Sequence, residues 1–211
     1  MERMNTFVRS LSDILTGANY DRTAELLGFG RSFYRTAADL IPTNPYSRIL
    51  ELGCGTASLT LAIADKHGGK GWFHGMDLRP WKLSFAQLKA REARVSFEPY
   101  RRSMRTLPFE SASMDMVVAG PSFHQASPAL RRRALNETGR VLKPKGVFAL
   151  IDWSKPRFGL MALILFPLLM FKTSGDHWNN TYPMLCRDEN LLLIMDTYVN
   201  SVIRCQVFRK A

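Results

Sequence analysis

Residues 49–57, ILELGCGTA, hold the most informative pattern in this chain of 211 residues. An apolar run typical of a buried strand leads into a turn with two glycines, Gly53 and Gly55, and then into a segment with helical spacing. Glycine lets the backbone approach a ligand closely, and the following helix presents free N–H groups and the positive end of its dipole. The pattern predicts a doubly wound α/β domain whose first turn binds a carboxylate, a ribose or a phosphate.

A carboxylate roughly twenty residues further on strengthens this interpretation. Asp77 closes a second apolar strand, expected over residues 71–77, and can accept hydrogen bonds from both hydroxyls of a ribose. The turn departs from the dinucleotide fingerprint, because the third glycine of that fingerprint would fall at Ser58. The sequence therefore does not specify an NAD fold, and a tight loop without a ligand is the alternative.

Four segments follow one another along the chain: ELGCGT at 51–56, GMDL at 75–78, LPF with SMD at 107–109 and 113–115, and RVLKPKG at 140–146. In order and spacing they resemble the class I S-adenosylmethionine (SAM) dependent methyltransferases, most of all the branch of ubiquinone and menaquinone biosynthesis. The resemblance covers roughly residues 47–153. It implies the fold and the cofactor, SAM, and says almost nothing about the acceptor.

The resemblance implies roles for residues near the first two strands. Gly53 and Gly55 would pass close to the methionine part of SAM, and Glu51 would bind its ammonium group. Asp77 would accept the ribose hydroxyls and Leu78 would pack on the adenine. A buried Glu51 without a partner would be costly, which favours a ligand role for it. The full set of predicted cofactor residues is Glu51, Gly53, Cys54, Gly55, Asp77, Leu78, Ser103, Met104 and Ala119.

One residue that the family usually provides is absent. Relatives carry an Asp that accepts the adenine amino group a few residues before the Leu-Pro-Phe motif, whereas this chain has Ser103 and Met104. The Ser103 hydroxyl can accept the same hydrogen bond, and the backbone N–H of Met104 can reach a ring nitrogen. Ala57 also stands where a third glycine is common, a change that we expect the fold to tolerate unless its φ is positive.

Candidate acid, base and acceptor-binding residues fall at the carboxyl ends of later strands, where an open α/β sheet has its ligand crevice. His124 can accept a proton near neutral pH, and a structural histidine is the alternative. Asp152 with aromatic neighbours can bind an ammonium group by charge and cation–π attraction. The catalytic candidates are His124, Asp152 and Tyr20, and the acceptor-binding candidates are Trp153, His177, Trp178 and Tyr182.

The composition bounds the class of protein. With 211 residues and 46% apolar content, the chain fits one domain with a sizeable core. Cys54, Cys186 and Cys205 show neither metal-binding spacing nor a disulfide framework, and the N-terminal residues do not read as a secretory signal. We therefore expect a cytoplasmic protein in a reducing compartment, without a metal site.

The formal net charge of +11 is the strongest compositional deviation. Basic residues dominate residues 79–105, and residues 131–133 are three consecutive arginines. Such a surface can contact an anionic membrane, a nucleic acid or an acidic partner. A solvated basic face that only keeps the protein soluble is the alternative.

Residues 158–171, FGLMALILFPLLMF, contain no charged side chain. The run is shorter than the roughly twenty residues that span a bilayer, and Pro167 would interrupt a continuous helix. It can be a buried helix, a lid over an apolar acceptor or a segment that enters the membrane interface. The resembled family covers its acceptor with the region after the fifth strand, and Lys155, Arg157 and Lys172 flank the run. We therefore favour a lid or a membrane contact.

The remaining pattern predicts one domain with four parts. These are an N-terminal helical cover over residues 1–45, a SAM-binding core over 46–153, an apolar substrate lid over 154–190 and a C-terminal hairpin over 191–211. Strands are predicted at 48–52, 71–77, 95–98, 115–119 and 147–152. The competing prediction for the apolar run from Leu191 is a helix through Met195. The fold class is α/β: a Rossmann-like, doubly wound, seven-stranded sheet, mostly parallel, with an antiparallel last strand.

Together these observations predict a SAM-dependent methyltransferase that acts on a small lipophilic acceptor near a membrane surface. A quinone precursor and a phospholipid amine are the two acceptors that fit. Methylation of RNA or another nucleic acid is the alternative that the arginine clusters suggest, although the chain lacks an Asn/Asp-Pro-Pro-Tyr motif. A non-catalytic SAM-binding partner protein is the third possibility, supported by the absent adenine-binding Asp.

Overall fold

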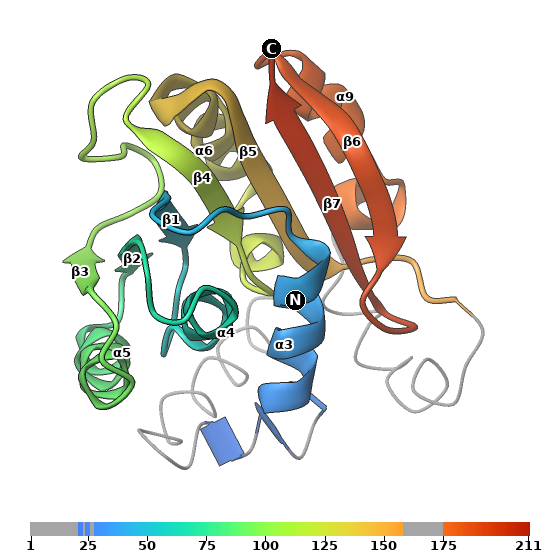
Figure 1. The fold of residues 1–211 in the computed structure, drawn as a ribbon. Helices are drawn as coiled ribbons and strands as arrows, with labels where there is room; N and C mark the ends of the chain where they lie inside the picture. The colour runs from blue at the N-terminus through green and yellow to red at the C-terminus, as the bar shows by residue number, and fades with distance from the viewer. Residues whose placement is uncertain (1–20, 23, 26–27, 158–174) are drawn as a thin grey trace.

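A seven-stranded sheet with the strand order β3-β2-β1-β4-β5-β7-β6 forms the centre of the molecule (Figure 1). In this computed structural model, the described residues are 21–22, 24–25, 28–157 and 175–211. The first five strands are parallel, and β7 runs antiparallel between β5 and β6. The order reverses direction between β1 and β4, as in the predicted doubly wound sheet.

A helix lies between each pair of consecutive parallel strands except β3 and β4. The strands are β1 (Arg48–Leu52), β2 (Trp72–Asp77), β3 (Phe97–Arg101), β4 (Met114–Ala119), β5 (Leu142–Trp153), β6 (Leu191–Tyr198) and β7 (Ile203–Lys210). The helices are α3 (Arg31–Leu40), α4 (Ser58–Lys66), α5 (Pro80–Glu92), the short 3₁₀ helix η1 (Phe123–Gln125), α6 (Pro128–Val141), α8 (Gly175–Trp178) and α9 (Tyr182–Arg187).

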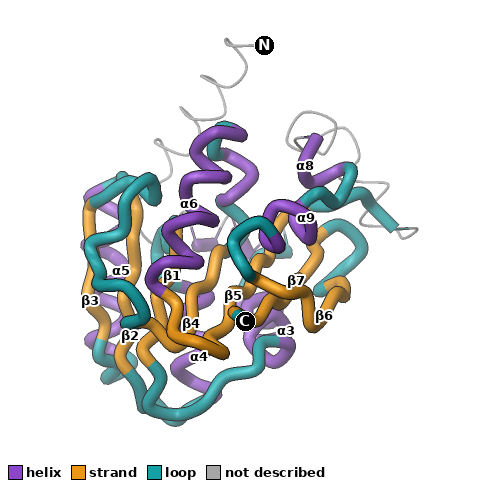
Figure 2. The backbone as a smooth tube through the Cα atoms, turned by 90° about the horizontal axis from the view of Figure 1, so that it is seen from above, coloured by secondary structure: helices purple, strands orange, loops and turns teal. Residues whose placement is uncertain are grey.

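Two apolar cores lie on opposite faces of the sheet. One core packs α3 and α4 against the sheet, and the other packs α6 and α9 against it (Figure 2). Successive strand residues point to opposite faces, so Ile49 and Leu50 belong to different cores. Both faces of β1 and β4 are therefore buried, which explains their nearly continuous apolar sequences.

The starts of the third and fifth strands differ from the sequence-based prediction by two residues or more. The third strand spans Phe97–Arg101 rather than 95–98, because Val95 belongs to the capping turn after α5. Arg94 has a φ of 56°, its N–H donates to Arg91 O, and the Val95 N–H donates to Ala90 O. These are the two hydrogen bonds of a Schellman cap.

The fifth strand begins at Leu142 rather than at Val147. Leu142 already pairs with Met114, and the register then shifts before Met116 pairs with Val147. The segment between these pairs is an irregularity within the ladder rather than a loop before the strand.

The terminal elements follow the prediction where the structure describes them. Helix α3 ends before Pro42, and the run from Leu191 is strand β6 of a β6–β7 hairpin rather than a helix. The Asn200 side-chain oxygen accepts hydrogen bonds from the N–H groups of Val202 and Ile203 at the turn. Within the described ranges no helix is both long and apolar enough to cross a bilayer. Tyr20 and the apolar run 158–171 lie outside those ranges.

Candidate functional site

The glycine turn connects the end of β1 to the start of α4. Gly53, Gly55 and Ala57 have φ values of 67°, 53° and 59°. A Cβ at Gly53 would overlap the Ser122 side chain, and its φ is one that L side chains rarely adopt, so glycine is strongly favoured there. The Cys54 N–H donates to Met76 O at 2.8 Å, which keeps the turn beside β2. The turn therefore has the curvature and the small side chains that close approach of a ligand requires.

Ala57 departs from the expectation that it would be tolerated, because the condition on its φ is not met. Its φ of 59° and ψ of 27° are left-handed, and the residue is the N-cap of α4. A residue with a Cβ costs about 1–2 kcal/mol in that conformation. The turn thus keeps a local strain that a glycine would remove.

Glu51 has a partner within the fold, so the cost of an unpartnered buried carboxylate no longer argues for a ligand role. Its Oε2 accepts hydrogen bonds from the Thr60 N–H at 3.1 Å and from the Thr60 hydroxyl at 2.5 Å. Glu51 is 3% exposed. Burial raises the pKa of Glu51 to about 7, and the bonds from Thr60 only partly oppose this shift. The carboxyl is therefore close to half-ionised at neutral pH, and a cation bound beside it would favour the charged form.

Asp77 lies where β2 ends, close to the glycine turn. Its Oδ2 accepts the Gly55 N–H at 3.0 Å and its Oδ1 accepts the Arg79 N–H at 2.8 Å. The carboxylate thus ties the turn after β1 to the start of α5. Leu78 beside it is 63% exposed. The structure brings Glu51, the glycine turn, Asp77 and Leu78 together at one end of β1 and β2.

The other predicted cofactor residues surround this end of the sheet. Ala119 ends β4 and is the register partner of Leu52 on β1. Ser103 and Met104 follow β3; the Ser103 hydroxyl accepts the Arg105 N–H at 3.3 Å, and Met104 packs against the core on the α6 face. Burial raises the pKa of the Cys54 thiol well above its ordinary value, so this thiol is not a nucleophile at neutral pH.

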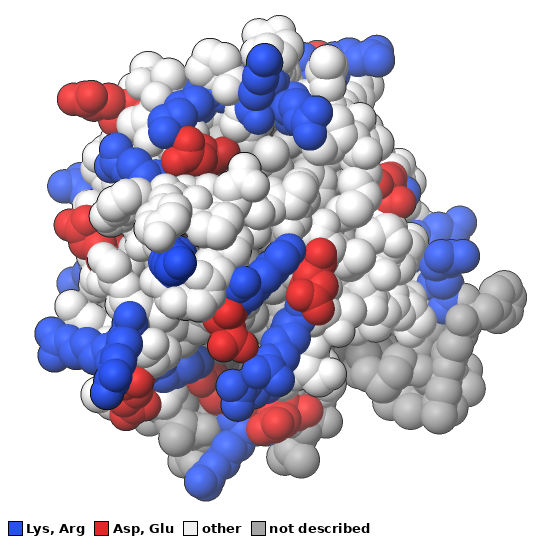
Figure 3. Space-filling view, viewed as in Figure 1, with Lys and Arg blue, Asp and Glu red and all other residues white. Residues whose placement is uncertain are grey.

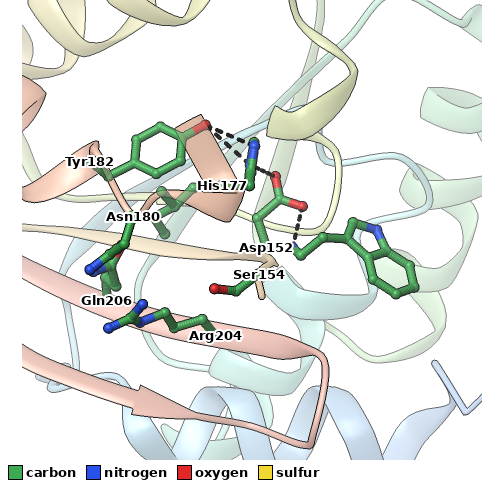
Figure 4. A pocket seen from close by; sticks show the side chains of 9 residues that line it. Asp152, Ser154, His177, Asn180, Tyr182, Arg204 and Gln206 are labelled. Carbon is green, nitrogen blue, oxygen red and sulfur yellow. Dashed lines mark hydrogen bonds and ion pairs between the residues drawn. The ribbon is translucent and has the colours of Figure 1, made fainter. Parts of the chain in front are cut away.

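A second cluster lies at the carboxyl ends of β4 and β5, around the Asp152 carboxylate. The His124 N–H donates to Asp152 Oδ2 at 2.7 Å, and His124 Nδ1 lies 2.8 Å from Oδ1. His177 Nε2 lies 3.3 Å from Oδ2, and the Tyr182 hydroxyl lies 3.1 Å from the same nitrogen (Figure 4). The side chains of His124, Asp152 and His177 are 5%, 2% and 1% exposed. One buried carboxylate therefore holds two imidazoles.

The charge of Asp152 determines how the imidazoles are protonated. Burial acts to raise the pKa of the Asp152 carboxyl, but the charge and hydrogen bonds of His124 and His177 outweigh burial and hold the pKa well below its ordinary value. An ionised carboxylate accepts, so His124 Nδ1 carries the proton of this contact. Burial and the Asp152 charge raise the pKa of Tyr182, which remains a neutral phenol.

A small polar pocket opens beside this cluster, between β5, β7 and the α8–α9 region (Figure 4). Arg204, on its wall, is held by Asp196 at 2.5 and 2.6 Å. The residues that line it are Leu150, Asp152, Trp153, Ser154, His177, Asn180, Tyr182, Arg204 and Gln206. The pocket brings together three of the four predicted acceptor-binding residues: Trp153, His177 and Tyr182. The fourth, Trp178, is half-buried on α8 and does not line the pocket.

Part of the basic charge is internal, which the sequence pattern missed. Arg131, in the arginine triplet, is 1% exposed and donates to Asp176. Lys89 donates to Asp21 and to Ser58, beside the glycine turn. On the face shown in Figure 3, acidic side chains lie among the basic ones. The sequence did indicate that Arg131 could be buried, because it shares a helix face with the apolar Ala134 and Leu135.

Comparisons with known proteins agree with this geometry. Residues 49–146 match the family model described as a methyltransferase domain. A demethylmenaquinone methyltransferase of Symbiobacterium thermophilum is 30% identical over 172 residues, covering 75% of this chain and 65% of that protein. The demethylmenaquinone methyltransferase of Bacillus pumilus is 28% identical over 141 residues, covering 65% and 59%. The matches thus span less than two thirds of these relatives' length.

A solved structure shares the fold over almost the whole chain. The crystal structure of a SAM-dependent methyltransferase from Aquifex aeolicus superposes with a TM-score of 0.69 at 17% identity, covering 90% of this chain and 95% of that one. The sheet order, the glycine turn and the matched domain agree with one another and with the resemblance noted in the sequence. Residues 49–146 therefore form a methyltransferase domain, and the chain has the fold of the SAM-dependent methyltransferases.

Proposed function

We propose that this chain transfers the methyl group of SAM to a small acceptor. Two neighbouring regions at the carboxyl edge of the sheet have different roles in this reaction. The ends of β1 and β2 hold the cofactor, and the ends of β4 and β5 hold the base. The observation that carries the proposal is the Asp77 carboxylate bonded to the Gly55 N–H at 3.0 Å, which joins a glycine turn and an acidic strand end at one place. That juxtaposition suits a ribose beside an amino-acid group.

The residues at β1 and β2 fit the charges of SAM. A buried carboxyl with a pKa of about 7 is unfavourable to ionise by itself, and an ammonium group beside Glu51 would compensate it. Asp77 has two carboxylate oxygens with further lone pairs for ribose hydroxyls. Leu78 offers an exposed apolar surface for a purine ring. When bound, SAM supplies an electrophilic methyl group, and the protein's main task is to align an acceptor with it.

His124 is the residue that would take the acceptor's proton. Asp152 fixes Nδ1 of this imidazole, so Nε2 is the basic nitrogen, and the ionised carboxylate would stabilise the imidazolium that forms. General-base catalysis of this kind contributes roughly 10²–10⁴-fold. Asp152 acts through His124 and not on the acceptor itself.

The acceptor we favour is a quinone precursor rather than a phospholipid amine. Both curated relatives are named for demethylmenaquinone methylation. Both Asp152 carboxylate oxygens already contact an imidazole, and the carboxylate is buried, which leaves little room for an ammonium group. Trp153 packs edge-on against His124 with ring centroids 6.2 Å apart and also lines the pocket beside Asp152, so an aromatic side chain stands next to the proposed base. A cytoplasmic location near a membrane surface, with the basic side chains contacting anionic lipid, completes the proposal.

Transfer of a labelled methyl group from SAM tests this function. A cell lipid extract and total RNA are incubated in parallel with the protein and with Asp77→Ala. We expect label in the quinone fraction of the lipid extract, and none with the variant. Label in RNA would instead support the nucleic-acid alternative, which the buried Arg131 weakens. SAM binding without transfer to either would support a non-catalytic partner protein and contradict the proposal.

A further inference from the structure

Arg131 is a buried cation with two different partners. On α6, its Nη1 donates to the Ala126 carbonyl at 2.7 Å. Its Nε and Nη2 donate to Asp176 Oδ2 at 3.2 and 2.6 Å. Removing a guanidinium from water costs several kcal/mol, and only good hydrogen bonds and an opposite charge offset this. A residue of this kind needs a structural reason for its place.

The two partners belong to the two segments that deliver the imidazoles. Ala126 directly follows η1, which contains His124, and Asp176 directly precedes His177 in α8. The Thr181 hydroxyl donates to Asp176 Oδ1 at 3.0 Å, which holds that carboxylate from its other side. One guanidinium therefore connects two chain segments whose histidines meet at Asp152.

We propose that Arg131 is a positioning residue, which sets η1 and α8 so that His124 and His177 both reach the Asp152 carboxylate. The effect of Arg131 on catalysis rests on the proposed function. Its effect on the positions of the two histidines does not depend on that function. Arg131 touches neither the cofactor residues nor Asp152 and would act only through the two segments.

A guanidinium is suited to this task and an ammonium is not. Arginine presents five N–H donors in a fixed plane, so it can bind a carbonyl on one side and a carboxylate on another. Lysine carries the same charge on a single nitrogen at the end of a flexible stem. With Arg131→Lys we expect one of the two partners to lose its hydrogen bond while the charge balance is kept.

Nitrogen NMR of the imidazoles tests the proposal without any assay of activity. The chain has four histidines, and His67 and His74 serve as internal references because they lie on α4's end and on β2. In the unsubstituted protein we expect His124 as a single Nδ1–H tautomer. In Arg131→Lys we expect the ring-nitrogen chemical shifts of His124 and His177 to move toward those of an imidazole that exchanges between its two tautomers. The chemical shifts of His67 and His74 should stay unchanged.

A neighbouring variant is the matched control. Arg132→Lys makes the same chemical change one residue away, at an exposed position, and should leave all four imidazoles unchanged. If Arg131→Lys does not fold, Asp176→Asn keeps the arginine and weakens one of its partners, and it should disturb His177 more than His124. A folded Arg131→Lys or Asp176→Asn protein with unaltered His124 and His177 signals would overturn the proposal.

The kinetic consequence separates this inference from the proposed function. If methyl transfer is established, Arg131→Lys should lower kcat at least tenfold and leave the SAM dissociation constant within twofold. If no methyl transfer is found at all, the NMR result still decides whether Arg131 sets the two imidazoles.

Discussion

The ends of β1 and β2 and the ends of β4 and β5 lie on the same edge of one sheet, but they are held together in different ways. At β1 and β2 the bonds join nearby positions and involve backbone N–H groups: Thr60 with Glu51, nine residues apart, and Gly55 with Asp77, 22 apart. At β4 and β5 a backbone bond from the His124 N–H is joined by bonds between side chains over longer separations, 28 residues for His124 with Asp152 and 45 for Arg131 with Asp176.

This difference predicts which substitutions should disturb each region. The ends of β1 and β2, the proposed cofactor end, depend on the geometry of a short turn and should be affected mainly by changes within that turn. The ends of β4 and β5, the proposed acceptor end, depend on buried polar side chains from four segments, so a change in any one of them should disturb the others. Variants should therefore divide into those that lose cofactor binding and those that lose turnover.

The largest expected effect is that of Asp152→Asn on turnover. We expect kcat to fall by about 10²–10⁴-fold, because the amide no longer fixes the His124 tautomer or stabilises an imidazolium. The SAM dissociation constant should change by less than about threefold, because the cofactor end is separate. Single-turnover kinetics and calorimetry measure the two quantities.

Asp196→Asn is the control for that variant, since it alters another ion pair close to the same pocket, with Arg204, without touching an imidazole. It should leave kcat nearly unchanged. Removing one partner of a buried pair can also cost about 3–5 kcal/mol, so urea unfolding of Asp152→Asn is measured alongside. Equal losses of SAM affinity and turnover in Asp152→Asn would mean that the two ends do not act separately.

The next effect concerns cofactor affinity in Asp77→Ala. We expect the SAM dissociation constant to rise about 100-fold or more, since hydrogen bonds to a charged group are worth about 1.5–3 kcal/mol each and the glycine turn also loses its anchor. Titration calorimetry measures this directly. Affinity within threefold of the unsubstituted protein would remove Asp77 from the ribose site.

Glu51 should link cofactor affinity to pH. Its pKa of about 7 is raised above 4.5, so its contribution to folding stability is fully present below pH 4.5 and is lost as the pH rises through 7. A bound ammonium favours the ionised form and therefore lowers this pKa. SAM affinity should then rise up to about tenfold per pH unit below pH 7 and level off above it.

Glu51→Gln should flatten this dependence and weaken SAM binding about tenfold at pH 8, where the lost interaction is a charge-assisted hydrogen bond. Proton release on binding, measured by calorimetry in buffers of different ionisation enthalpy, reports the same linkage. A Glu51→Gln protein with the full pH dependence would assign that dependence to another group.

The smallest effect is expected for Ala57→Gly. Glycine removes the strain of a left-handed alanine, which stabilises the folded state by about 1–2 kcal/mol. The greater conformational freedom of glycine in the unfolded chain opposes this gain by about 0.4–1 kcal/mol. We expect a net gain of up to about 1.6 kcal/mol in the free energy of unfolding by urea. Ala93→Gly, at a φ of −79°, is the matched control and should be destabilised.

The same contrast between the two ends explains what could be predicted from the sequence. The glycine turn, the position of Asp77 and the strand order follow from patterns with fixed spacing, and the structure confirms the fold. The N-cap at Ser127 was also predictable, and its hydroxyl accepts the Leu130 N–H. Local backbone preferences decide these features, so a single sequence contains them.

Other features depend on tertiary contacts that no local pattern records. The sequence placed His124, Asp152 and His177 in one region but gave no sign that one carboxylate would hold both imidazoles. The helical spacing of Arg131 with Ala134 and Leu135 indicated burial, but its partner Asp176, 45 residues away, could not be predicted. Thr60 as the partner of Glu51 was missed for a different reason, since a threonine in the first turn of a helix has many ordinary uses.

A structure of the chain with S-adenosylhomocysteine tests the central claim most directly. The account predicts the amino-acid part beside Glu51 and Gly53, the ribose on Asp77, and the sulfur facing the region of His124. A nucleoside bound elsewhere, with the Asp77 carboxylate unoccupied, would contradict it.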